Sequence, residues 1–154
     1  MASVLLAIAV VGIAGPLGAA STQSRFGQER GAAIALAREL MEEIAAKPLV
    51  DTTTTKGLGP ETAQGETDRS RYDAANDYDG YTDSTAALTN LSGAVVTYDP
   101  AAVYTRTVSV QFRASPNGAA VGSGDFGIVT VTVTTPHKQS VKISRMLSNV
   151  VMAY

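Results

Sequence analysis

The sequence predicts an α+β fold, in which one long N-terminal α-helix packs on an antiparallel sheet of three or four strands. Residues 1–48 have helical character, with an uncharged apolar half at 4–20 and an amphipathic half at 24–46. Near the other end of the chain, apolar residues recur with a period of two, which is typical of strands with one buried face. We therefore expect a helix followed by a globular head over 49–154.

Composition narrows the classes of function. The chain has 154 residues, a formal net charge of −2 and no cysteine. A length of this size corresponds to about one domain. The charge gives no electrostatic case for nucleic-acid binding. The absence of cysteine excludes disulfides, thiol catalysis and cysteine-based metal sites.

The apolar half of the helix has three interpretations. A cleavable secretion signal is preceded by basic residues and ends at small residues; Gly18–Ala20 fit such a cleavage site, but the first basic residue is Arg25. A membrane-spanning helix needs about 20 apolar residues, and Val4–Ala20 provides 17. A buried core helix is the third interpretation, although apolarity on every face is unusual in a small domain.

The amphipathic half continues the helix and favours the second interpretation. Its apolar residues recur at three- and four-residue spacing and form one stripe, which we expect to pack on the sheet: Phe26, Ala33, Leu36, Ala37, Leu40, Met41 and Ile44. The charged residues fall mostly on the other faces, and Lys47-Pro48 ends the helix.

A helix over 4–46 would be about 65 Å long at 1.5 Å per residue, which is too long for a compact domain of this size. The apolar half is therefore expected to lie in lipid or among other copies of the chain. Pro16 should kink or loosen the helix. The residues expected in this membrane and assembly segment are Val4, Leu5, Leu6, Ile8, Val10, Val11, Ile13, Pro16 and Leu17.

The head is predicted to begin with a polar loop over 50–90 and to continue as a sheet over 94–150. A loop of about forty residues suggests a function or partial disorder. Strands are expected at 94–99, 103–114, 126–136 and from 140 onward, joined by short connections that make the sheet antiparallel. Their inward residues should face the helical stripe: Val108, Val110, Phe112, Val129, Val131, Val133, Val141, Ile143, Arg145 and Leu147.

Four aspartates in the loop, Asp73, Asp77, Asp79 and Asp83, are the candidate metal ligands. Carboxylates at this spacing can hold Ca²⁺, but the match to an EF-hand loop is poor, and a solvated acidic turn is the competing interpretation. Interleaved tyrosines at 72, 78 and 81 are expected to pin the loop to the sheet. His137 lies in a predicted turn, so no catalytic triad is indicated. We expect no enzymatic activity and no cofactor other than this possible calcium ion.

Three stretches in this order resemble the type IV pilin-like superfamily, which includes the pseudopilins of type II secretion. They are "ASVLLAIAVVGIAGPLGAAS" running into "ERGAAIALARELMEEI", the loop "LGPETAQGETDRSRYDAANDYDGYTDS", and "YTRTVSVQF" followed by "FGIVTVTVTTPHKQSVKISRML". The resemblance implies a pilin-like fold and a structural filament subunit. The subunit would be held in the inner membrane before assembly and then pack with copies of itself or related subunits, in an extracellular pilus or periplasmic pseudopilus. Some pseudopilins bind calcium, which adds weight to the aspartate site.

One feature of that superfamily does not occur in these residues. Its processing site is a glycine, an aromatic residue and then Thr-Leu-x-Glu ahead of the apolar run, whereas this chain has Met1-Ala2-Ser3 there. Processing by a prepilin peptidase therefore cannot be argued from these residues. The alternative function is a secreted or surface β-rich binding module with a cleavable signal peptide.

Overall fold

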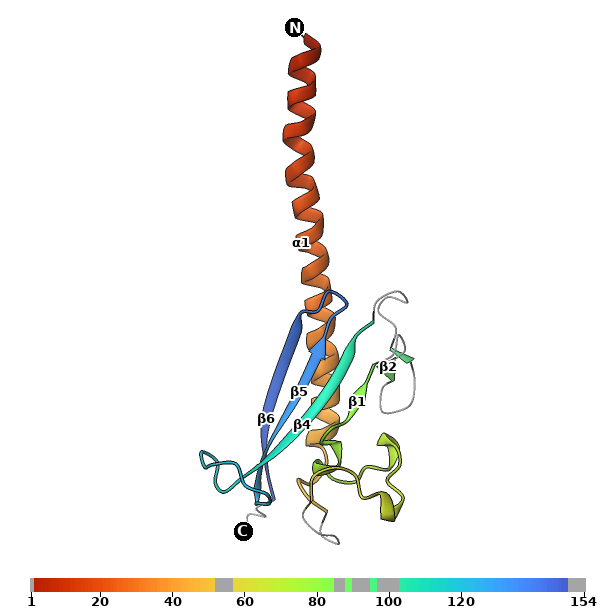
Figure 1. The fold of residues 1–154 in the computed structure, drawn as a ribbon, viewed down its shortest axis with the longest axis vertical. Coiled ribbons are helices and arrows are strands. Elements are labelled where there is room, and N and C mark those ends of the chain that lie inside the picture. Colours follow the sequence, from red (N-terminus) through yellow and green to blue (C-terminus); the bar gives the residue numbers. More distant parts are fainter. Residues whose placement is uncertain (1, 52–56, 85–87, 90–94, 97–102, 150–154) are drawn as a thin grey trace.

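The computed structural model describes residues 2–51, 57–84, 88–89, 95–96 and 103–149 (Figure 1). Side chains are described from Thr22 onward within these ranges, except at 64, 88–89 and 95–96. The described residues form an α+β fold, as predicted, with a long helix on a four-stranded antiparallel sheet of order β1-β4-β5-β6. Its elements are α1 (Ala2–Ala45), β1 (Thr82–Asp83), β4 (Thr105–Arg113), β5 (Phe126–Thr134) and β6 (Ser140–Ser148).

Helix α1 has 44 residues, which corresponds to about 66 Å. Its first half extends beyond the sheet, and its second half lies along it (Figure 1). The helix continues without a break through Pro16, although an interior proline removes a hydrogen-bond donor and its ring crowds the carbonyl four residues earlier. The nine residues predicted for the membrane and assembly segment lie where no side chains are described. In the part of the chain whose side chains are described, no helix is long and apolar enough to cross a membrane.

The apolar stripe of α1 packs on the sheet as predicted. Its fully or almost fully buried members are Ala33, Leu36, Ala37, Leu40, Met41 and Ile44. Phe26 differs, because it lies beyond the core and its half-buried ring meets the His137 ring edge-on at 5.3 Å between centroids. The helix ends at Ala45, where the amide of Lys47 bonds to the carbonyl of Ile44 at 3.1 Å, just before Pro48.

The central strands form the other side of the core. In β4 and β5, alternate residues are buried, and valines oppose one another at Val108–Val131 and Val110–Val129. Each buried valine contributes roughly 1.5 kcal/mol or more through removal of apolar surface from water. Gly127 of β5 leaves room for Leu49, whose side chain would lie 2.5 Å from an added Cβ.

Strand β6 is the outer strand and is less buried than its neighbours. Val141, Ile143 and Leu147 pack against the core from the helix side. Arg145 points the same way, with its Nη1 3.8 Å from Oε1 of Glu42 on α1. This placement confirms the predicted facing of the strand, although Arg145 itself is half-exposed.

The predicted strand at 94–99 does not join this sheet. Its described part, β3 (Val95–Val96), pairs with β2 (Leu88–Thr89) in a separate two-stranded sheet, and 94 and 97–99 lie outside the described residues. The fourth strand of the main sheet is instead β1, from inside the predicted loop. Two residues carry no readable alternation, so the sequence pattern could not reveal β1.

The predicted loop is folded over its longest described stretch, 57–84. It contains the 3-10 helices η1 (Thr62–Gln64), η2 (Arg69–Arg71) and η3 (Asn76–Tyr78). The amides of Ala75 and Asn76 bond to the carbonyls of Pro48 and Leu49 at 2.8 and 3.1 Å. These backbone hydrogen bonds join residues that are remote in the sequence and attach the loop to the segment that follows α1.

Candidate functional site

The folded loop is joined to the helix by a buried polar network. Glu43 of α1 accepts hydrogen bonds from Nε of Arg69 at 2.8 Å and from the hydroxyl of Tyr78 at 2.6 Å. Nη1 of Arg69 also lies 4.0 Å from Oδ2 of Asp83. Asp83 accepts from Nε of Arg106 at 3.0 Å. The network therefore connects helix, loop and sheet through alternating acidic and basic side chains, and we call it the Glu43 network.

Burial sets the electrostatics of this network. The Arg106 side chain is fully buried and that of Glu43 is 4% exposed. Burial raises the pKa of Glu43, but the hydrogen bonds from Arg69 and Tyr78 outweigh it and hold the pKa below its usual value. Burial and the bond to Glu43 raise the pKa of Tyr78. Glu43 therefore stays ionised and Tyr78 stays neutral at neutral pH.

Three tyrosines line the same loop. The rings of Tyr72 and Tyr78 meet edge-on at 5.0 Å between centroids, and Tyr81 lies 6.0 Å from Tyr78. Tyr78 belongs to the hydrophobic core, and the other two pack against it. The tyrosines fix the loop to the core, as the sequence predicted.

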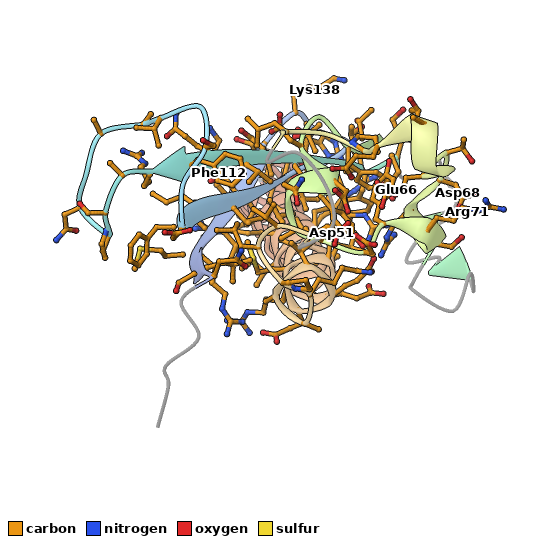
Figure 2. The ribbon with its side chains drawn as sticks, turned by 90° about the horizontal axis from the view of Figure 1, so that it is seen from below. Asp51, Glu66, Asp68, Arg71, Phe112 and Lys138 are labelled. Atoms are coloured by element: carbon orange, nitrogen blue, oxygen red, sulfur yellow. The ribbon has the colours of Figure 1, made fainter. Side chains whose placement is uncertain are left out.

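A second polar feature is a cluster of three carboxylates, Glu61, Glu66 and Asp77, which we call the carboxylate cluster. One oxygen from each lies within 4.8 Å of the others. Glu66 and Asp77 are buried. In Figure 2, Glu66 lies nearer the body of the domain, whereas Asp68 and Arg71 lie toward the outer edge.

The cluster brings like charges together away from water. Burial, together with the charges of Glu66 and Glu61, raises the pKa of Asp77 to about 7, although hydrogen bonds from the amides of Ala74 and Asp73 oppose the shift. Burial also raises the pKa of Glu66; the hydrogen bond from the Glu61 amide opposes this shift, and the side chain of Glu61 adds to it. Carboxylates in such a setting require a proton or a cation.

The four predicted metal ligands are not brought together as one set. Only Asp77 belongs to the carboxylate cluster. Asp79 accepts from the amide of Val110 at 2.7 Å, and Asp83 belongs to the Glu43 network. Asp73 is exposed, and its amide donates to Oδ2 of Asp77 at 3.1 Å. Asp79 and Asp83 thus act as anchors of the loop.

The sequence interpretation missed several residues of these two sites. Glu43 follows Leu36 and Leu40 at seven and three residues, so the helical spacing itself places it on the buried face. Arg106 precedes Val108 and Val110 at two-residue spacing, so the alternation of the strand likewise places it on the buried face. Arg69, Glu61 and Glu66 gave no such signal, because they lie in a segment without periodicity.

His137 lies in the β5–β6 turn and is half-exposed, in keeping with its predicted surface position. Its Nδ1 is 2.9 Å from Oε2 of Glu29 on α1. Together with Phe26, this contact ties the turn to the helix near the point where α1 leaves the sheet.

Comparison with known proteins gives no assignment: no protein-family model, curated protein or solved structure matches the chain.

Proposed function

We propose that the chain is a structural subunit of a type IV pilus-like or pseudopilus filament, held in the inner membrane by its N-terminal helix before assembly. The observation that carries this proposal is the combination of length and composition in α1. The helix extends well past the sheet (Figure 1), and the sequence of the extending half is uncharged and apolar.

The packing of the head supports the proposal. Among the side chains that the structure describes, the helical residues of the core begin at Ala32 and Ala33, and the first half of α1 extends away from the sheet (Figure 1). An apolar helix without cover exposes a large apolar surface, which soluble monomers rarely do. Lipid or neighbouring subunits would supply that cover. Each Å² of apolar surface removed from water stabilises the covered state by about 25 cal/mol.

Membrane fractionation of cells that express the full chain tests the proposal. Val11→Asp and Ile13→Arg each place a charge in the apolar half, at a cost of about 3 kcal/mol near the centre of a bilayer. Both variants should lose membrane retention and assembly while the head keeps its far-UV circular dichroism. Ala35→Asp, which adds a charge at an exposed position of the sheet-bound half, is the matched control and should be retained.

Normal retention and normal filaments from Val11→Asp would refute the proposal. Mass spectrometry of the native N-terminus distinguishes the alternative, a secreted or surface binding module. A mature terminus near Ser21 would support that alternative, because cleavage there removes the apolar half. A terminus that retains the apolar half supports the filament subunit.

A further inference from the structure

The carboxylate cluster combines three features that ordinary surface acids lack. The oxygens of Glu61, Glu66 and Asp77 converge within 4.8 Å. Asp77 is fully buried, and Glu66 is almost so. The amide of Glu61 donates to Oε2 of Glu66 at 2.8 Å, so the backbone of one member orients the carboxylate of another.

An unsatisfied atom gives the independent indication of a ligand. Oδ2 of Asp77 accepts from the amide of Ala74 at 2.7 Å, whereas Oδ1 is buried with no hydrogen-bond partner among the described residues. A buried carboxylate oxygen without a partner is costly, and native proteins usually satisfy such atoms with a protein group, a water or an ion.

Nearby basic side chains are directed elsewhere. Arg69 bonds to Glu43, and Arg71 is largely exposed, with its Nε 3.7 Å from Asp68 and its Nη1 3.3 Å from the carbonyl of Gly65. Lys47 donates to the carbonyl of Tyr72. These contacts of the three cations lie outside the carboxylate cluster.

We propose that Glu61, Glu66 and Asp77 bind a calcium ion, with Oδ1 of Asp77 as one ligand. Hard carboxylate oxygens select hard cations such as Ca²⁺ and Mg²⁺. Ca²⁺ binds oxygen at about 2.3–2.6 Å, so two of its ligands can be about 5 Å apart, whereas the shorter Mg²⁺ distances of about 2.1 Å limit them to about 4.2 Å. The spacing of the cluster thus accommodates Ca²⁺ with less movement. This site does not depend on the filament function.

The test is calorimetric titration of the purified full chain in detergent, freed of metal by chelation, with CaCl₂ and separately with MgCl₂ at a pH of about 8. We expect one calcium ion per chain, a weaker response to magnesium and a rise in Tm of about 5 °C at saturation. Asp77→Asn and Glu66→Gln should each weaken calcium binding by about 100-fold or abolish it. Two variants keep the test valid if one does not fold.

Asp73→Asn is the matched control. Asp73 lies four residues before Asp77, its side chain is exposed and outside the cluster, and the substitution removes the same charge. It should retain calcium binding. Calcium binding that persists in both Asp77→Asn and Glu66→Gln would overturn the proposal, since the ion would then lie elsewhere. Absence of any calcium response in the wild-type chain, up to about 5 mM, would also overturn it and leave protons as the neutralising species.

Discussion

At the scale of single residues, Glu43 decides how the loop meets the helix. Its carboxylate is shared between Arg69 and Tyr78 and is almost completely removed from solvent. Loss of one partner of a buried charge pair leaves the other partner buried and uncompensated, which is the costly situation. Glu42, its neighbour in the sequence, is 76% exposed. Adjacent glutamates of one helix therefore have opposite energetic roles.

This contrast gives the first prediction. Glu43→Gln should lower the free energy of unfolding by about 3 kcal/mol, because the Arg69 guanidinium loses its buried counter-charge. Glu42→Gln should change it by less than about 0.5 kcal/mol. Urea denaturation followed by circular dichroism measures both values. Equal effects of the two substitutions would contradict the role given to Glu43.

Lys138 supplies a second prediction at this scale. It is the non-glycine residue with a positive φ, 62°, among the described residues, and it lies in the turn between β5 and β6. A left-handed backbone is strained for a side chain with a Cβ and is free of that strain for glycine. Lys138→Gly should raise the free energy of unfolding by about 0.5 kcal/mol, whereas Lys138→Val should lower it by about 1 kcal/mol. Thermal unfolding of the two variants measures the sign of each change.

At the scale of elements, two carboxylates, Glu43 of α1 and Asp77 of the loop, have folded-state pKa values that shift in opposite directions: that of Glu43 is lowered and that of Asp77 is raised. Glu43 has a lowered pKa in the folded state. Its contribution to the free energy of unfolding is therefore present above its usual pKa and is lost as the pH falls through the lower folded value. Asp77 has a raised pKa of about 7. Its contribution is therefore largest below its usual pKa of 3.8 and is lost as the pH rises toward 7.

The third prediction follows from that sign. In the presence of a chelator, the free energy of unfolding of the wild-type chain should fall between about pH 4 and pH 7 by about 3 kcal/mol more than that of Asp77→Asn. The asparagine keeps the shape of the protonated carboxyl and removes its titration. Urea denaturation at a series of pH values measures the difference, and parallel pH profiles for the two proteins would contradict it.

Periodic elements could be predicted from the sequence, whereas the elements without a period could not. Periodicity places Leu36, Leu40 and Ile44 on the sheet and Val129, Val131 and Val133 in the core, because the burial of one face imposes the pattern. Strand β1 and the carboxylate cluster follow no period. Strand β1 depends on contacts such as that of Asp83 with Arg106, which lie 23 residues apart in the sequence. The carboxylate cluster depends on how the loop folds to bring Glu61, Glu66 and Asp77 together.

At the scale of the whole molecule, the chain divides into a head with its own core and a helical half that extends beyond it (Figure 1). A chain lacking residues 1–24 should therefore remain folded, since from Thr22 onward, where side chains are described, the buried helical residues begin at Glu29 and Ala33. It should behave as a soluble monomer on gel filtration, with near-native far-UV circular dichroism for the sheet. Filaments that persist in this truncated chain would place the assembly contacts in the head.

The most direct test of the filament proposal is the sedimentation of the intact chain in buffer without detergent or lipid. We predict large assemblies that become dispersed when detergent is added, because the uncharged, apolar first half of α1 extends beyond the sheet (Figure 1). The truncated chain, run beside it, should sediment as a single small species. An intact chain that sediments as a stable monomer in plain buffer would contradict the account.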